Sequence, residues 1–370
     1  MKIFYFSSTH WDREWYQTFQ GFRRRLVETT EGVCRHLEAD PEFGVFHFDG
    51  QTIVLEDVFE MRPDLRPRIE KLIDEGRILI GPWYVMPDEF LVSGEALIRN
   101  LALGHRIASE YDTQAWKFGY VCDIFGHIAQ FPQILAGFGI SYALLGRGTN
   151  EETTDRYFLW EAPDGTRAIT LKLRDWYGYG DFNMSVFGFE DLRVDEATFK
   201  ERAKRYIDEL RSTTDQPVLF LMDGIDHAPI HSQTSEFLRW IRELYPDSEV
   251  HHTNLQAAGQ ALEPYRSELQ VKRGELVEPT KEVAPYSHLI TNTLSSYYPL
   301  KRWNDELQTM LEAVVAPILA VERGDGGGTF DLQPYEDLAW RTLLKNHPHD
   351  SIGGCSIARV HTDMEYRFAQ

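Results

Sequence analysis

Histidine and aspartate side chains that could hold a metal occur in short motifs near opposite ends of the sequence. His10 and Asp12 are separated by one residue, so in an extended segment both side chains point to the same side. An imidazole and a carboxylate are both ligands that suit zinc. Near the other end, His347 and His349 stand in an Asn-His-Pro-His-Asp turn. Each motif alone is also typical of hydrogen-bonded loop residues or of a helix C-cap, so a shared metal site requires a fold that joins the two ends.

Two further aspartates, Asp123 and Asp226, follow two different apolar runs. Glycoside hydrolysis needs two carboxyl groups, one that attacks the sugar or orients water and one that protonates the leaving oxygen. Aromatic residues after other runs, such as Trp11 and Trp83, are of the kind that stacks on sugar faces, although a tryptophan taken alone is more often part of a core. Arg147 follows yet another run. The pattern predicts an active site at one edge of a sheet.

Short apolar runs predict the strands that must position these side chains. Helical patterns fill several of the gaps, and Phe22, Leu26, Val33 and Leu37 share one helix face. Strands that alternate with helices predict an α/β fold with a parallel sheet or an incomplete β/α barrel. Ligands bind at the carboxyl ends of such strands, which is where the polar residues follow. The predicted strands are residues 3–6, 45–48, 78–80, 118–121, 142–145, 169–173 and 218–222.

Beyond Pro264 the pattern changes from alternating strands and helices to helices alone. A long amphipathic helix is predicted through Trp303, Leu307, Met310, Leu311, Val314 and Ile318. A second helix is predicted over residues 335–344 and a third from about Ser356. Residues 326–328 are three glycines without the strand and Lys-Ser/Thr of a phosphate-binding loop, and we expect a plain loop there. The prediction is a catalytic α/β domain over 1–265 and a three-helix bundle over 266–370.

Composition and charge limit the classes of partner. The 370 residues include 38 Lys and Arg against 58 Asp and Glu, a formal net charge of −20 that disfavours nucleic acid and anionic membrane surfaces. An anionic substrate would need a local basic pocket. Three scattered cysteines suit a reducing compartment, and no apolar run reaches the roughly 18 residues of a membrane helix. We therefore expect a cytoplasmic protein, with oligomer formation left open.

Four motifs, in this order, resemble those of the α-mannosidases of glycoside hydrolase family 38. They are STHWDREW at 8–15, GPWYVMPDE at 81–89, DIFGHIAQ at 123–130 and HPHDSI at 347–352. The last motif is most similar to that of bacterial mannosylglycerate hydrolases, which act on a mannosyl or phosphomannosyl glycerate. The resemblance covers most of the chain and implies a retaining, exo-acting enzyme that hydrolyses terminal α-mannosyl bonds.

The resemblance also implies a single zinc ion held by His10, Asp12, Asp123 and His349. Of the two histidines in the last motif, His349 is assigned because the family's ligand directly precedes an aspartate. The zinc would bind vicinal hydroxyls of the sugar and would not generate a hydroxide nucleophile. The family's chains continue after their helical segment into β-rich domains that also close on the sugar pocket, so a chain of this length is expected to hold only the first domains.

In the same way, the resemblance implies the roles of the catalytic side chains. Asp123 would be the nucleophile as well as a zinc ligand, and Asp226 would be the acid/base, since it matches the family's position better than Asp223 does. Arg147 is similar to a family arginine beside the nucleophile, and with Trp11 and Trp83 it is assigned to substrate binding.

Two other classes of function remain compatible with these residues. One is a zinc-dependent amidase or deacetylase on a related α/β scaffold, which would use a zinc-bound water and three protein ligands. The other is a fragment that binds zinc and sugar without turnover. A histidine ligand from a distant helical segment argues against the first class.

Overall fold

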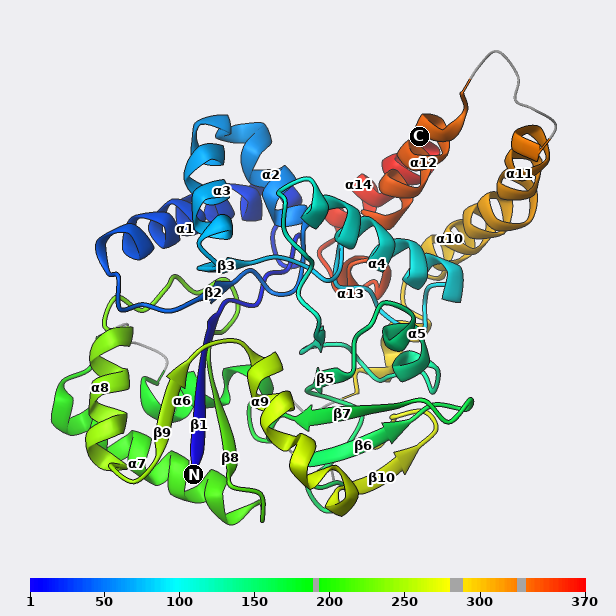
Figure 1. Ribbon diagram of the computed structural model, residues 1–370. Coiled ribbons are helices and arrows are strands. Elements are labelled where there is room, and N and C mark those ends of the chain that lie inside the picture. Colours follow the sequence, from blue (N-terminus) through cyan, green and yellow to red (C-terminus); the bar gives the residue numbers. More distant parts are fainter. Residues whose placement is uncertain (189–192, 280–288, 325–330) are drawn as a thin grey trace.

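The computed structural model describes residues 1–188, 193–279, 289–324 and 331–370 (Figure 1). Its first sheet has the order β3-β2-β1-β8, with β9 also paired to β1, and every pairing is parallel. The strands are β1 (Lys2–Ser8), β2 (Phe46–His47), β3 (Ile78–Leu79), β8 (Val218–Asp223) and β9 (Glu249–His252). The predicted α/β fold with a parallel sheet is therefore confirmed, and β1 lies at its centre.

A second sheet has the order β10-β6-β7-β5-β4 and is mixed. Its strands are β4 (Gly119–Val121), β5 (Tyr142–Leu145), β6 (Tyr157–Glu161), β7 (Arg167–Lys172) and β10 (Gln270–Arg273). This sheet differs from the predicted parallel sheet, because β6 and β7 pair antiparallel, with Leu159 opposite Ile169. Only antiparallel neighbours can be joined by a short turn, and Gly165, with a φ of 87°, makes that turn. The predicted strands also did not include β6, β9 and β10.

Helices pack around the two sheets (Figure 1). They are α1 (Phe19–Ala39), α2 (Ile53–Met61), α3 (Arg66–Asp74), α4 (Gly94–Ser109), α5 (Phe131–Gly137), α6 (Asp181–Val186), α7 (Glu196–Ser212), α8 (Thr234–Leu244) and α9 (Leu255–Leu262). The face of α1 predicted from Phe22, Leu26, Val33 and Leu37 is buried in one core cluster with α2 and α3. No helix within the described ranges combines the length and apolar character needed to cross a membrane.

The C-terminal segment is helical, as predicted. It contains α10 (Tyr298–Met310), a π-helical turn (Leu311–Val315), α11 (Ala316–Gly324), α12 (Gln333–Leu344), α13 (His349–Ile352) and α14 (Ala358–Ala369). The separate three-helix bundle and the boundary at 265/266 stay predictions. The glycines at 326–328 lie outside the described residues.

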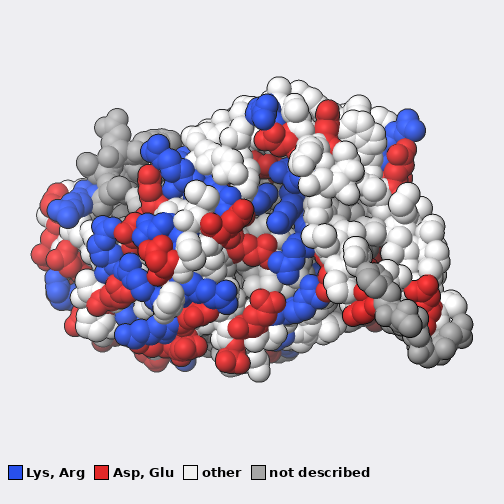
Figure 2. Space-filling view, turned by 90° about the horizontal axis from the view of Figure 1, so that it is seen from above, with Lys and Arg blue, Asp and Glu red and all other residues white. Residues whose placement is uncertain are grey.

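The apolar face predicted for the long helix is only partly buried, which corrects the sequence-based interpretation. Leu311 is buried, but Met310, Val314 and Ile318 are 55%, 50% and 54% exposed. The helix runs away from the two sheets, so little of the chain packs against its far end (Figure 1). Uncharged surface correspondingly dominates the right-hand part of the face in Figure 2, whereas acidic and basic side chains mix on the left.

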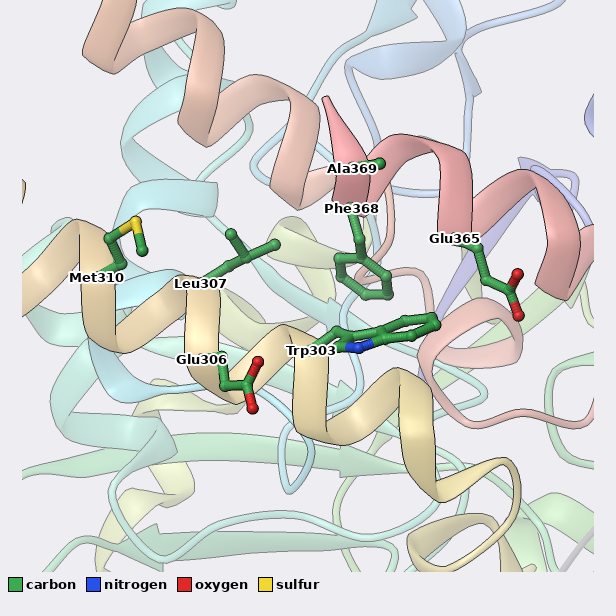
Figure 3. A pocket seen from close by; sticks show the side chains of 7 residues that line it. All are labelled: Trp303, Glu306, Leu307, Met310, Glu365, Phe368 and Ala369. Atoms are coloured by element: carbon green, nitrogen blue, oxygen red, sulfur yellow. The ribbon is translucent and has the colours of Figure 1, made fainter.

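A shallow groove lies between α10 and α14 (Figure 3). Trp303 and Phe368 meet edge to face across it, with ring centroids 6.3 Å apart, and Leu307 and Met310 continue its apolar wall. The groove is formed by helices alone and includes none of the predicted site residues.

Backbone hydrogen bonds and ion pairs hold the helical segment against the α/β part. Pro87 and Pro348 form an antiparallel bridge, and the His349 amide donates to the Met86 carbonyl at 3.2 Å. The Glu14 carboxylate, which is 0% exposed, is ion-paired with Arg367 of α14. These contacts place His349 beside the loop that follows β1.

Replacing Arg367 with methionine should lower the free energy of unfolding by about 3–5 kcal/mol, because the buried Glu14 charge loses its cation. Urea denaturation followed by circular dichroism measures the change. The matched control is Arg359→Met on the same helix, whose partner Asp363 forms an exposed pair at 3.2 Å, with side-chain exposures of 69% and 33%. That variant should lose less than about 1 kcal/mol. Equal losses in the two variants would contradict a structural role for the buried pair.

Candidate active site

The loops that follow four strands bring the predicted side chains together. His10 and Asp12 follow β1, Asp123 follows β4, Arg147 follows β5 and Asp226 follows β8. Parallel strands end at one edge of a sheet, which is the usual place for a ligand site in such folds. The predicted site residues therefore come from loops of both sheets.

Four side chains form a compact, buried cluster. His10 Nε2 lies 3.0 Å from Asp12 Oδ1 and 3.7 Å from Asp123 Oδ2. His349 Nε2 lies 3.4 Å from each of the same two oxygen atoms. The structure thus brings together the four residues predicted as metal ligands, although they come from three separate parts of the sequence.

The donor atoms of this cluster fit a divalent cation. With metal–ligand bonds of about 2.1 Å, tetrahedral geometry places ligand atoms about 3.4 Å apart. The four nitrogen–oxygen distances given above range from 3.0 to 3.7 Å. His10 Nε2, Asp12 Oδ1 and His349 Nε2 are buried and have no hydrogen-bond partner in the described part of the chain. Unpaired buried polar atoms are costly, and a bound cation would satisfy all three.

The cluster also has the electrostatics of a cation site. Although burial opposes ionisation, the neighbouring His10 lowers the pKa of Asp12 to about 2. Burial also disfavours the charged form of His349, yet the carboxylate of Asp350 and the other acids nearby raise the pKa of His349 to about 9. The carboxylates therefore favour positive charge at the ring nitrogens, the place where a metal would supply it.

Asp123 is held as a carboxylate. Arg147 Nε donates a hydrogen bond of 2.9 Å to Asp123 Oδ1, while Oδ2 faces the two histidines. Burial raises the pKa of the Asp123 carboxyl, but the Arg147 guanidinium and the His349 ring overcome this and hold the pKa well below its usual range. Asp123 is thus charged at neutral pH and keeps one oxygen fixed by arginine.

Asp226 has a different environment on the neighbouring loop. His10 and Asp226 form a parallel bridge that continues the β1–β8 pairing. The Tyr179 hydroxyl donates to Asp226 Oδ1 at 2.6 Å. Burial, reinforced by the charges of Asp12 and Asp123, raises the pKa of Asp226 to about 6. A carboxyl group with such a pKa can both donate and accept a proton near neutral pH.

Asp223, the alternative to Asp226, is occupied by structural partners. Its carboxylate accepts hydrogen bonds from Tyr5 at 2.7 Å and Asn183 at 3.2 Å, and lies 2.6 Å from His231 Nδ1. Burial raises the pKa of Asp223, but the charge of His231 lowers it by more, so the pKa lies below its ordinary value. A buried, ionised carboxylate without a free oxygen is poorly suited to deliver a proton.

The assignment of Trp11 and Trp83 to sugar stacking is corrected by their burial. Trp83 is 0% exposed, stacks on Phe131 and donates its indole N–H to the Tyr120 carbonyl at 3.0 Å. Trp11 is 2% exposed and packs edge to face against Phe22. Neither ring has a free face because both strand-end positions turn into the core.

Three residues that lie at the site were given no role from the sequence. Tyr179 contacts Asp226 and the ring of His10, but it lies on a one-turn helix with no periodic signal. Asp49 follows β2, and its place after a strand is the signal that points to it. Asp350 served only to identify His349, yet its carboxylate lies within ligand range of Asp12 and His349.

The sequence of residues 1–288 matches the model of the glycosyl hydrolases family 38 N-terminal domain. Over 98% of its length the chain is 36% identical to a Halalkalibacterium halodurans protein named "Putative mannosylglycerate hydrolase", covering 40% of that protein. It is 26% identical to "Alpha-mannosidase 2C1" of Mus musculus over 96% of its length, covering 32% of that protein.

A solved structure is also similar to this chain over its whole length. The crystal structure of an alpha-mannosidase from Enterococcus faecalis V583 matches all of this chain with a TM-score of 0.88 and 31% sequence identity. The chain covers 40% of that structure, as it covers 40% of the Halalkalibacterium protein. With a family model matched from residue 1 to residue 288 and the whole fold shared, the chain belongs to glycosyl hydrolase family 38.

Proposed function

We propose that this chain carries the active site of a zinc-dependent, retaining, exo-acting α-mannosidase. The observation that carries the proposal is the position of Asp123. It lies between the Arg147 guanidinium and the two histidines of the buried cluster of His10, Asp12, Asp123 and His349, called the cation cluster below. One carboxylate thereby belongs both to the metal site and to the catalytic pair. The names of the relatives, an alpha-mannosidase among them, support the same activity.

The two carboxyl groups would divide the reaction between them. Asp123 attacks the anomeric carbon while Asp226 gives its proton to the leaving oxygen, so a glycosyl-enzyme forms and the aglycone departs. Asp226, now ionised, takes a proton from water, and the water oxygen displaces Asp123 from the sugar. Arg147 keeps Asp123 ionised and oriented, and Tyr179 holds one oxygen of Asp226 so that the other faces the substrate.

His10, Asp12, Asp123 and His349 would hold the zinc ion. When bound, the ion supplies Lewis-acid sites for vicinal sugar hydroxyls and helps to hold the ring in a flattened shape. A metal-dependent amidase would not need the Asp226–Tyr179 pair, and the family membership favours glycoside hydrolysis.

The substrate class that we propose is an α-mannosyl glycerate, with or without phosphate. The proposal follows from the name of the Halalkalibacterium relative and from the last motif of the sequence. Turnover of mannosylglycerate compared with an aryl α-mannoside tests it, and a preference for the aryl compound would contradict it. A cytoplasmic location agrees with three free cysteines.

Purified protein should contain one zinc ion per chain, and His349→Ala should remove it. The ring contributes one of two nitrogen ligands, so its loss should leave the metal weakly held while the sheets stay folded. Elemental analysis and circular dichroism measure both properties. The matched control is His347→Ala, because the His347 ring lies 2.7 Å from Asn304 and does not join the cluster. Metal retained in His349→Ala, or lost equally from both variants, would reject the ligand assignment.

Asp226→Ala should lower turnover of a natural α-mannoside by about 10²–10⁴-fold, the usual contribution of general acid–base catalysis. A dinitrophenyl α-mannoside needs no proton on its leaving group, so its first step should survive and a mannosyl-enzyme should accumulate. Azide should then restore turnover and yield an α-mannosyl azide, which proton NMR identifies. Asp223→Asn serves as the control and should show no azide rescue. A β-azide product would reject retention, and no rescue of Asp226→Ala would reject its acid/base role.

The chain spans 40% of the length of the Halalkalibacterium relative, so binding has to be measured separately from turnover. A chain that binds zinc and an α-mannoside but forms no mannosyl-enzyme from the dinitrophenyl substrate would match the alternative of a binding fragment without turnover. Calorimetric titration of an α-mannoside into zinc-loaded and chelator-treated protein separates these cases.

A further inference from the structure

Asp49 is a fully buried carboxylate that the proposed reaction does not use. It follows β2, is 0% exposed, and its Oδ2 lies 2.9 Å from His10 Nδ1, on the opposite side of the ring from the cation cluster. We infer that Asp49 is a positioning residue, which holds the His10 proton on Nδ1 and leaves the Nε2 lone pair for the metal. The inference rests on the metal site of the proposed function.

The hydrogen bonds around Asp49 show which nitrogen of His10 carries the proton. Oδ2 also accepts from the Trp11 amide at 2.8 Å and from the Gln51 side-chain amide at 3.0 Å. An oxygen that accepts from two such donors can only be an acceptor toward the third partner. The His10 Nδ1 atom must therefore be the donor, so a neutral His10 ring carries no proton on Nε2.

The orientation of Gln51 is itself determined by its neighbours. Its Oε1 accepts from the Met86 amide at 3.0 Å, and its Nε2 donates to the Trp11 carbonyl at 2.9 Å as well as to Asp49. A flipped amide would place its NH₂ group against the Met86 N–H and its oxygen against two acceptor oxygens. Asp49 and Gln51 together join the loops after β1, β2 and β3. These hydrogen bonds between loops hold Asp49, the acceptor for His10, in place.

The second oxygen of Asp49 has a separate partner. The Cys122 thiol donates to Asp49 Oδ1 at 3.6 Å, and Cys122 Sγ also lies 3.5 Å from His10 Nδ1. His10, Asp49 and Cys122 could in principle hold a cation of their own. The three donors on Asp49 Oδ2 argue against that arrangement, because a metal there would have to displace the His10 hydrogen bond. Outer partners of a ligating histidine typically change metal affinity by about 10–100-fold.

The test compares two substitutions at Asp49. Asp49 has a φ of 52°, so glycine removes the side chain without adding strain to the backbone. Asparagine keeps a carbonyl oxygen that can face the same three donors and also tolerates this conformation. Asp112→Gly is the matched control, since Asp112 has a φ of 50° but is exposed in the turn after α4.

Zinc affinity is measured by competition with a chromophoric chelator. Asp49→Gly should bind zinc about 10–100-fold more weakly than the wild type. Asp49→Asn should recover most of the loss, and Asp112→Gly should match the wild type. In zinc-loaded protein labelled with ¹⁵N-histidine, the hydrogen-bonded Nδ1 proton of His10 should be present in the wild type, shifted in Asp49→Asn and lost in Asp49→Gly.

The outcomes separate this inference from the proposed function. Wild-type protein that binds no zinc would overturn the metal site itself. Zinc binding in the wild type with equal affinity in Asp49→Gly would overturn the inference alone. Equal, large losses in Asp49→Asn and Asp49→Gly would also overturn it, because they would indicate that the charge of Asp49 binds the metal directly.

Discussion

Negative charge buried at the ends of the strands is the constraint on which the rest of the site depends. Asp12, Asp49, Asp123 and Asp350 are between 0% and 9% exposed. Carboxylates so close together and so little hydrated repel one another unless cations or hydrogen-bond donors offset their charge. Arg147 does so for one oxygen of Asp123. The remaining charge faces the ring nitrogens of two histidines, where a divalent cation would complete the balance.

This constraint explains why a helical segment far along the chain is fixed so firmly against the α/β part. His349 can belong to the cluster only if α13 stays beside the loop after β1. Backbone hydrogen bonds to the segment around Pro87 and the buried Glu14–Arg367 pair provide that support. The last motif therefore contributes His349 to the cluster of His10, Asp12 and Asp123. The contacts at Pro87 and Glu14 do not join this cluster, but they hold His349 in position.

The two carboxyl groups that we propose as catalytic are distinguished by their surroundings. Asp123 has a guanidinium on one side and imidazoles on the other, which lower its pKa, whereas burial and neighbouring charges raise the pKa of Asp226 to about 6. Environments that push the pKa values of two acids apart in this way support the proposed roles of nucleophile and acid/base. Asp223 is only three residues from Asp226, but it accepts hydrogen bonds from Tyr5 and Asn183, which give it a structural role.

The sequence by itself determined the α/β fold class, most of the strands and the positions from which the polar side chains come. Alternating apolar runs and helical faces are local patterns, and motif spelling carried the family resemblance. Only the tertiary structure decided which of these side chains meet. It placed Trp11 and Trp83 in the core, paired β6 with β7 in antiparallel fashion, and set Asp49 behind His10. The reason is physical: burial, strand direction and hydrogen-bond partners depend on residues distant in sequence, which no local pattern specifies.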